Sequence, residues 1–305
     1  MEVHPLAAVT FSTGLFGTTL MLYLMGFVLV KASFRNAFGF FSLSQICSHL
    51  GLLLIILGPV TVEIMWNDLV PDIMAIYVGY FALVFQFTGH YAMCLMTANR
   101  FCAVFFPLRY SSLFTNKKGL LYVISSWIFA LAQCGVYLIN DCTFTFLGVN
   151  LHFNFEQTSC GFYVSTFQDF IYNGATAICA FLFDLVTLVR LVYLYKRRHS
   201  SGRNLKIDTF SKERTLFTQA MVASLMYLVM LLCFHIGTRF TTDGVNLFWL
   251  TTFTWELYLC LDGLSIFFIY SELRQPLYSV KKFFAPRKAY VSPAEELHIE
   301  IADSA

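Results

Sequence analysis

The sequence predicts an all-α membrane protein: a bundle of seven transmembrane helices with its N-terminus outside and its C-terminus in the cytoplasm. The first observation behind this prediction is the composition. Of the 305 residues, 58% are hydrophobic and 12% are charged, and the mean hydropathy is +0.66. A soluble domain usually carries about 25% charged residues, so this chain has too few charges to cover a water-facing surface. The other two observations are the lengths of the apolar runs and the placement of the basic residues.

Seven apolar stretches reach the roughly 20 residues that cross a bilayer as a helix. Because no water is present there to bond to the backbone, each of these stretches must be helical. Residues 1–275 are expected to form the membrane domain, and residues 276–305 are expected to form a cytoplasmic tail. The predicted spans are roughly 7–30, 37–62, 73–103, 119–140, 169–195, 215–236 and 247–271.

The first three spans each have a distinguishing feature. The first follows Glu2 and His4 without any preceding Lys or Arg, and it is longer than a signal-peptide core, so we expect it to be retained. Cleavage as a signal peptide, which would leave six spans, is the alternative. Gly58-Pro59 is expected to bend the outer end of the second span, and the length of the third span indicates a tilted helix.

The basic residues determine the predicted orientation, because Lys and Arg concentrate in the cytoplasmic loops of membrane proteins. With the N-terminus outside, every Lys and Arg except Arg239 falls in a cytoplasmic loop, at the cytoplasmic end of a span or in the tail. The opposite orientation would place nearly all of them on the wrong side. An odd number of spans puts the two termini on opposite sides, which agrees with this distribution.

Two of the nine cysteines are expected to form a disulfide. Cys142 and Cys160 both fall in the long outer loop between the fourth and fifth spans, in an oxidising compartment. Closing a loop of about 17 residues would constrain the unfolded chain by roughly 3 kcal/mol. Two free thiols are the alternative. The remaining cysteines lie in or beside spans and are expected to act as small apolar residues.

The stretch from Asn99 to Tyr110 lies where the third span meets the cytoplasm and is the most informative part of the sequence. An Arg at this position could simply extend its charged end to the membrane surface. However, the stretch resembles the Asp-Arg-Tyr…Pro-Leu-x-Tyr signature of rhodopsin-like G-protein-coupled receptors, with Arg100, Pro107 and Tyr110 at matching offsets. Trp127, in the fourth span, also occurs where that superfamily places a Trp.

This resemblance implies that Arg100 exchanges an intramolecular partner for a G protein on activation. A guanidinium near the membrane edge needs an acceptor, and its planar fork suits a carboxylate. Glu213, just before the sixth span, is a candidate resting partner; alternatively, it only offsets Lys212 and Arg214 at a helix start. The residues that the resemblance assigns to coupling and activation are Asn99, Arg100, Phe101, Pro107, Tyr110 and Glu213.

Several positions depart from the rhodopsin-like pattern. Asn99 stands where an acidic residue usually precedes the Arg, and Ala75 stands near the usual position of a disulfide Cys at the start of the third span. The sixth span contains no Pro, and the seventh carries no Asn-Pro-x-x-Tyr motif. The activation machinery of the superfamily therefore cannot be transferred as a whole.

These departures form a pattern of their own, because the chain resembles the nematode serpentine chemoreceptors, and among them the Srx class, over roughly residues 30–275. Cys142 and Cys160 match the paired cysteines that this class carries in its second outer loop. The other matching features are Phe38-Gly39, Leu43-Ser44-Gln45, Asn99-Arg100-Phe101-Cys102-Ala103, Asp184, Glu213 with Gln219, Thr252-Phe253-Thr254-Trp255, Asp262-Gly263 and Ser271-Glu272-Leu273-Arg274. The resemblance implies a chemosensory receptor for small environmental molecules in the plasma membrane of sensory neurons, with their cilia as a candidate location.

Polar residues within the spans are costly and usually face the interior of a bundle. Several lie toward the outer half beside aromatic residues, and small-molecule sites combine such polar anchors with apolar walls. Hydrogen bonding between helices is the alternative explanation for each. The predicted ligand-pocket residues are Phe85, Gln86, Tyr172, His235, Trp255, Glu256 and Tyr258. Asp184 and Asp262 lie deeper, where a structural or switching role is expected.

The leading functional hypothesis is a receptor that rearranges its helices on binding a small molecule and then activates a heterotrimeric G protein. A ligand-gated channel or small-solute transporter is the alternative, although the chain lacks the internal repeats that many transporters contain. We expect no enzymatic activity, metal or cofactor, because neither a metal-ligand spacing nor a Gly-x-Ser-x-Gly elbow is present. The net charge of only +2 gives no reason to expect a nucleic-acid partner.

Overall fold

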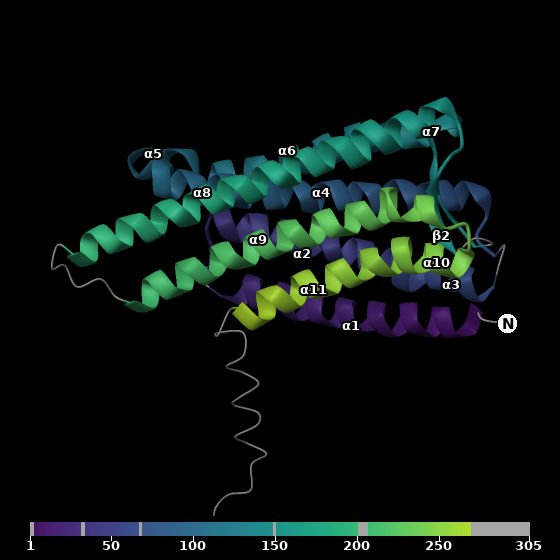
Figure 1. Ribbon diagram of the computed structural model, residues 1–305, viewed down its shortest axis with the longest axis horizontal. Coiled ribbons are helices and arrows are strands. Elements are labelled where there is room, and N and C mark those ends of the chain that lie inside the picture. The colour runs from purple at the N-terminus through teal and green to yellow at the C-terminus, as the bar shows by residue number, and fades with distance from the viewer. Residues whose placement is uncertain (1–2, 32–33, 67–68, 149–150, 201–206, 270–305) are drawn as a thin grey trace, which may run out of the picture. The chain divides into compact units, whose positions relative to one another are not determined.

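The computed structural model describes residues 3–31, 34–66, 69–148, 151–200 and 207–269. The predicted tail, 276–305, lies outside these residues. Within residues 3–269, long helices run side by side, and the connections between them gather at two ends (Figure 1). The short helix α5 (Pro107–Leu113) marks one end, which we call the α5 end. The disulfide between Cys142 and Cys160 marks the opposite end, which we call the disulfide end.

Four helical segments precede the long loop at the disulfide end. The first is α1 (Val3–Val30), and the second joins α2 (Ala37–Ile55), η2 (Ile56–Val60) and α3 (Thr61–Met65). The third is α4 (Asp72–Phe105), and the fourth joins α6 (Asn116–Cys134) to η3 (Gly135–Leu138). Each of these segments overlaps one predicted span.

Three more segments follow the loop. The fifth joins α7 (Ser159–Tyr163), η5 (Val164–Tyr172) and α8 (Asn173–Ser200). The sixth is α9 (Ile207–His235), which is followed by η6 (Gly237–Phe240). The seventh joins α10 (Gly244–Phe248), η7 (Trp249–Phe253) and α11 (Thr254–Ile269). Within the described residues, six of the seven are long and apolar enough to cross a membrane, and the seventh completes the bundle.

The third segment, α4, is a single uninterrupted α-helix. It contains 34 residues, which at 1.5 Å per residue corresponds to a length of about 51 Å. The hydrocarbon core of a bilayer is only about 30 Å thick. A helix of this length must tilt or extend beyond the hydrocarbon, as the sequence predicts for the third span.

Three segments contain π-helical turns close to the disulfide end: η2, η5 and η7. Pro59 lies inside η2, where the sequence predicts a bend. A proline cannot donate a backbone hydrogen bond and its ring collides with the preceding turn. A π turn accommodates such an interruption, and turns of this kind often occur at functional sites.

A two-stranded hairpin that was not predicted from the sequence covers the bundle at the disulfide end. Strand β1 (Phe144–Leu147) pairs antiparallel with β2 (His152–Phe155). The ring centres of Phe144 and Phe153 lie 6.3 and 5.4 Å from the ring centre of Trp255, which belongs to α11. The hairpin therefore packs its aromatic side chains onto the seventh segment.

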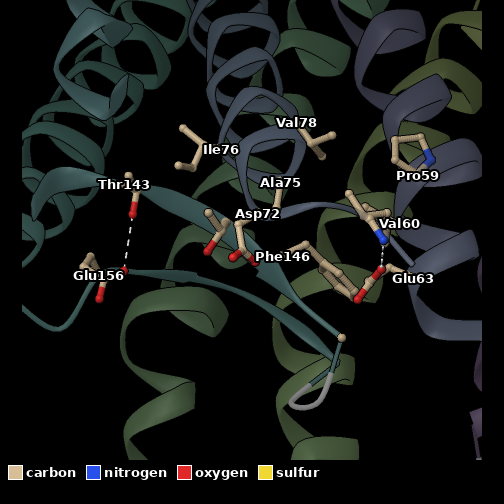
Figure 2. A pocket seen from close by; sticks show the side chains of 13 residues that line it. Pro59, Val60, Glu63, Asp72, Ala75, Ile76, Val78, Thr143, Phe146 and Glu156 are labelled. Carbon is tan, nitrogen blue, oxygen red and sulfur yellow. Dashed lines mark hydrogen bonds between the residues drawn. The ribbon is translucent and has the colours of Figure 1, made fainter. Parts of the chain in front are cut away.

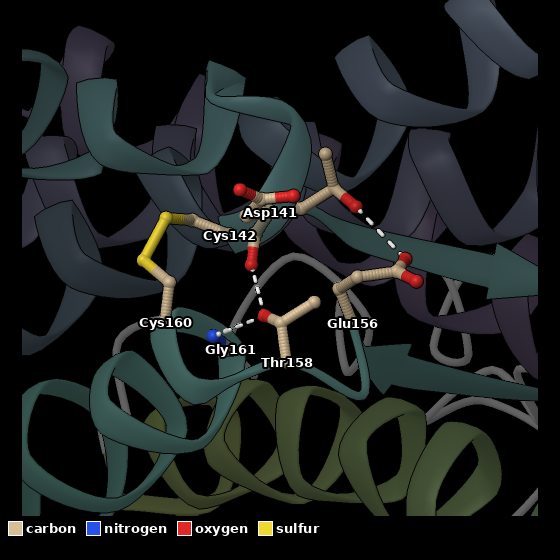
Figure 3. The surroundings of a disulfide bond; sticks show 7 residues. Asp141, Cys142, Glu156, Thr158, Cys160 and Gly161 are labelled. Atoms are coloured by element: carbon tan, nitrogen blue, oxygen red, sulfur yellow. Dashed lines mark hydrogen bonds between the residues drawn. A yellow bond between two sulfur atoms is a disulfide. The ribbon is translucent and has the colours of Figure 1, made fainter.

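The disulfide joins the residues before the hairpin to those after it (Figure 3). Cys142 ends the short helix η4 (Asn140–Cys142), and Cys160 lies in α7. Thr158 adds a second connection, because its hydroxyl donates to the carbonyl of Asp141 and accepts from the N–H of Gly161. The pair of cysteines that the sequence predicts is thus the pair that the structure joins.

Gly79 lets the hairpin approach α4 closely. A Cβ atom at this position would overlap the carbonyl oxygen of Phe144. The backbone of β1 therefore rests directly on α4, which leaves no room there for any side chain.

Gly79→Ala is expected to lower the melting temperature of the purified protein in nanodiscs, because the added methyl group must displace β1. Overpacking of this kind costs about 1–3 kcal/mol, which corresponds to several degrees. The matched control is Gly174→Ala in α8, where an added Cβ meets nothing within 4 Å and the helix propensity of Ala is favourable. Equal melting temperatures for the two variants would contradict the close contact.

Candidate functional site

A buried ion pair joins Arg100 of α4 to Asp184 of α8. The Nε atom of Arg100 lies 3.0 Å from Oδ1 of Asp184, and Nη2 lies 2.8 Å from Oδ2. The two side chains therefore meet in the two-pronged geometry that suits a guanidinium and a carboxylate. The Asp184 side chain is 1% exposed and the Arg100 side chain 12%, so neither charge has much access to water.

Thr97 and Phe217 complete the surroundings of this ion pair. The Thr97 hydroxyl donates to Oδ2 of Asp184 at 2.9 Å and accepts from Nη2 of Arg100 at 3.1 Å. The guanidinium carbon lies 5.8 Å from the ring centre of Phe217 in α9, which is within cation–π range. Residues from α4, α8 and α9 thus hold Arg100 in place. We call Thr97, Arg100 and Asp184 the Arg100 cluster.

The partner of Arg100 in the described residues differs from the candidate chosen from the sequence. The side chain of that candidate, Glu213, lies outside the described part of the chain. Among the described residues, Asp184 holds Arg100, and the sequence suggested only a structural or switching role for it. A signal was present in the sequence, because both charges lie in the halves of their spans that are predicted to be cytoplasmic, and an intramembrane charge needs a partner.

Asn99 and Tyr110 connect α4 to α5. Asn99 is buried, and its Nδ2 atom donates to the hydroxyl of Tyr110 at 3.3 Å. Pro107 is the first residue of α5, a position where the missing N–H of proline is tolerated. The rings of Phe101 and Phe183 of α8 meet edge to face, with their centres 5.0 Å apart. The predicted coupling residues of α4 and α5 therefore surround the junction of these helices at the α5 end.

A second buried polar cluster joins α2 to α11. The Nε2 atom of Gln45 donates to Oδ2 of Asp262 at 3.0 Å, and Nδ1 of His49 lies 3.3 Å from the same oxygen. The ring of Tyr258, one turn before Asp262, meets the ring of His49 edge-on at 5.8 Å. Asp262 therefore ties the seventh segment to the second. This contact is consistent with the structural or switching role expected for Asp262 from its depth in the predicted span.

A hollow of 880 Å³ lies at the disulfide end, with walls from β2, α7, η5 and the end of α9. His235 lines it, and its Nε2 atom lies 2.9 Å from Oδ2 of Asp169 in η5. The other carboxylate oxygen of Asp169 accepts from Nδ2 of Asn173 at 2.9 Å. Arg239 of η6 also lines the hollow. We call this space the large hollow.

A smaller hollow of 450 Å³ lies beside β1, between η2 and α4 (Figure 2). Three acidic side chains line it, and its described lining contains no Lys or Arg. Glu63 accepts from the N–H of Val70 at 2.9 Å, and Glu156 accepts from the Thr143 hydroxyl at 3.3 Å. Asp72 is the third acid. This hollow is acidic, whereas the large hollow carries both signs of charge.

Three of the predicted ligand-pocket residues lie below the hairpin in the bundle interior. Trp255 supports the hairpin from below. Gln86 of α4 and Tyr258 of α11 both face Tyr227 of α9. The side-chain oxygen of Gln86 is buried without a hydrogen-bond partner among the described residues, so it remains available to another donor.

The other predicted pocket residues face different neighbours. Phe85 packs against Trp127 of α6, and Tyr172 is 38% exposed. Glu256 is fully buried against α1, where a Cβ on Gly14 would lie 3.0 Å from its Oε1 atom. Of the seven predicted pocket residues, the described lining of the large hollow therefore contains only one, His235.

Comparison with known protein families identifies the class of the chain. The sequence profile of the family described as serpentine type 7TM GPCR chemoreceptor Srx matches residues 11–270. The chain belongs to this family. The resemblance to the Srx class that the sequence suggested is thereby confirmed, and this Srx receptor is a multi-pass membrane protein. The matched region includes both Arg100 and Asp184.

Two curated proteins illustrate the relationship of this Srx receptor to others. Serpentine receptor class X-43 of Caenorhabditis elegans is 25% identical over 258 residues, which cover 81% of this chain and 78% of that protein. Olfactory receptor 1500 of Rattus norvegicus is 26% identical over 148 residues, which cover 43% of this chain and 47% of that protein. The first relationship extends along most of both chains, and the second along less than half of each.

The fold of this Srx receptor is similar to that in the crystal structure of squid rhodopsin. The two superpose with a TM-score of 0.75, over 99% of this chain and 91% of the rhodopsin chain. Their sequence identity is 12%, so the likeness concerns the fold alone. It confirms the predicted seven-helix fold.

Breaking the Arg100–Asp184 pair from either side should destabilise the Srx receptor, because one buried charge then loses its partner. Arg100→Ala and Asp184→Ala are each expected to cost about 3–5 kcal/mol, measured as a lower melting temperature in nanodiscs. The double variant Arg100→Met/Asp184→Leu removes both charges and should recover most of that loss. Arg109→Ala, at an exposed basic position, is the control. If Asp184→Ala had the same melting temperature as the wild type, the ion pair would not be a stabilising contact.

Proposed function

We propose that this Srx receptor binds a small molecule at the disulfide end and activates a heterotrimeric G protein at the α5 end. Membership of a family of seven-transmembrane chemoreceptors supports the receptor class. The two-pronged Arg100–Asp184 pair is the observation that carries the coupling part of the proposal. The proposed location is the plasma membrane of sensory neurons, including their cilia.

The proposed orientation places the disulfide end outside and the α5 end in the cytoplasm, with residues 276–305 as a cytoplasmic tail. Two features support it. The disulfide between Cys142 and Cys160 requires an oxidising compartment. The connections at the α5 end are rich in basic residues, as cytoplasmic loops are, and they include Lys31, Arg35, Arg109, Lys117 and Lys118.

In the proposed mechanism, the Arg100 cluster represents the resting state. Asp184 and Thr97 occupy the Nε and Nη2 donors of Arg100. Because α4, α8 and α9 together hold the guanidinium, a displacement of α8 or α9 at the α5 end would release it. A released guanidinium has five donors, which can bind the backbone carbonyls or carboxylates of a G protein.

The large hollow is the proposed entry site for the ligand. Its volume of 880 Å³ lies in the range of small-molecule sites. His235 is in α9, and its partner Asp169 is in η5, which continues into α8. The same two segments carry Phe217 and Asp184 at the α5 end. A ligand that binds His235 better in one arrangement of these segments would therefore change how they hold Arg100.

The first test of the proposal is ligand-dependent G-protein activation in cells that display the receptor at their surface. After a panel of volatile compounds and small metabolites has identified an activator, Arg100→Ala should abolish the response at equal surface amounts, because the donor group for the G protein is gone. Arg109→Ala, the exposed basic control, should retain most of it. Arg100→Lys keeps the charge but lacks the planar fork, so it should give a reduced response.

Two results would contradict this proposal. A response that survives unchanged in Arg100→Ala would remove that residue from the coupling site. A ligand-evoked current that appears without any G-protein activation would replace the proposed receptor mechanism with the channel alternative.

The second test concerns the ligand end. His235→Gln is expected to raise the half-maximal activator concentration about tenfold, because the ligand loses its hydrogen bond to the imidazole of His235. A hydrogen bond that involves a charged group is worth about 1.5 kcal/mol or more. Glu256→Gln should leave that concentration within about twofold of wild type, because the carboxyl group faces α1. Dose–response curves measure both variants. A shift in Glu256→Gln without one in His235→Gln would move the ligand site toward α1.

A further inference from the structure

A third cavity lies between α4 and α8, beside the Arg100 cluster and apart from the two hollows at the disulfide end. Its volume is 290 Å³. The side chains that define it are Cys94, Thr97 and Phe101 from α4 and Thr176, Cys179 and Phe183 from α8. We call this cavity the α4–α8 cleft.

The cleft opens on the outer face of the bundle. Phe183 is 48% exposed, and Cys179 is also exposed. The lining residues lie in the α5-end half of the apolar segment Asp72–Phe105 and in the middle of the apolar segment Ser159–Arg197, and both segments are long enough to cross a membrane. A molecule in the hydrocarbon of the bilayer can therefore reach the cleft directly.

The hydroxyl groups that line the cleft already have partners. The Thr97 hydroxyl is bonded to Asp184 and to Arg100. The Thr176 hydroxyl lies 2.6 Å from Nε2 of His90 and 2.8 Å from the carbonyl oxygen of Tyr172. No described hydroxyl of the cleft is left to recognise a polar group. A ligand with its own donors or acceptors would have to leave them unpaired, at a cost of about 1–3 kcal/mol each.

We propose that the α4–α8 cleft binds a small, uncharged, apolar molecule from the bilayer, and that its occupancy stabilises the paired state of Arg100 and Asp184. The volume of 290 Å³ is near the lower limit for small-molecule sites. An apolar cavity of about 150 Å³ already holds benzene. The cleft is thus suited to a hydrocarbon of roughly ten carbon atoms.

The link to the Arg100 cluster follows from the walls of the cleft. Thr97 lines it and bonds to both members of the ion pair. Phe101 and Phe183 close one end of it through their edge-to-face contact at 5.0 Å. If α8 moves relative to α4, the cleft changes shape and the bonds from Thr97 and Arg100 to Asp184 are strained together. A molecule that fits the present shape therefore favours the present pairing.

The binding site can be tested on the full-length receptor in phosphatidylcholine nanodiscs with a photoreactive ten-carbon alkyl diazirine as the probe. Cys179→Phe places a large side chain in the cleft, whereas Ile178→Phe makes the same change at the adjacent exposed residue, which does not line it. Labelling of the peptides that contain residues 94–102 and 176–183 should fall at least fivefold in Cys179→Phe and stay unchanged in Ile178→Phe. The hydrocarbon limonene should compete with the probe and raise the melting temperature of the wild type by about 3 °C.

Equal labelling of wild type and Cys179→Phe, without competition by limonene, would overturn the proposal, because the probe would then report only random contact with bilayer lipid. The effect on signalling rests on the proposed function: limonene should lower G-protein activation in the wild type and not in Cys179→Phe. Labelling and melting require no G protein. A receptor that binds limonene and activates no G protein therefore contradicts the proposed function alone, and a receptor that signals without specific labelling contradicts the cleft site alone.

Discussion

A guanidinium inside a membrane needs an opposite charge, and this requirement ties together the helices at the α5 end of the receptor. The residue before Arg100 is Asn99, which bonds to Tyr110 and brings no charge. The carboxylate therefore comes from another helix, as Asp184 of α8. An acidic residue at position 99 would be a neighbour of Arg100 within α4, whereas the pair with Asp184 links α4 to α8. The position of α8 and the state of Arg100 then depend on each other.

The two ends of the receptor share the helices that would transmit a signal. The segment that ends in α8 carries Asp169 at the disulfide end and Asp184 at the α5 end, and α9 carries His235 and Phe217 at the corresponding ends. By contrast, Asp262 ties α11 to α2 through its own buried polar contacts. In the proposed mechanism, α8 and α9 change position relative to α4, and the α4–α8 cleft lies at the boundary between α8 and α4.

The seven helices could be predicted from composition and basic residues, because a bilayer permits few other structures. The hairpin was missed, although its strands, 144–147 and 152–155, place Phe at every second position, as strands do. The partner of Arg100 depends on the rotation and depth of other helices, which a single sequence does not reveal. The predicted pocket combined Phe85 with Gln86, yet neighbours on a helix point about 100° apart, so one of them had to face elsewhere.

We propose that the carboxylate of Asp184 holds Arg100 away from the G protein in the absence of ligand. The most direct test of this proposal is ligand-free activation of a panel of heterotrimeric G proteins by Asp184→Asn, compared with wild type at equal surface amounts. Asn keeps the size of the side chain and removes its charge, so basal activation several times that of wild type is expected. Basal activation at or below the wild-type level, with the response to an activator intact, would contradict it.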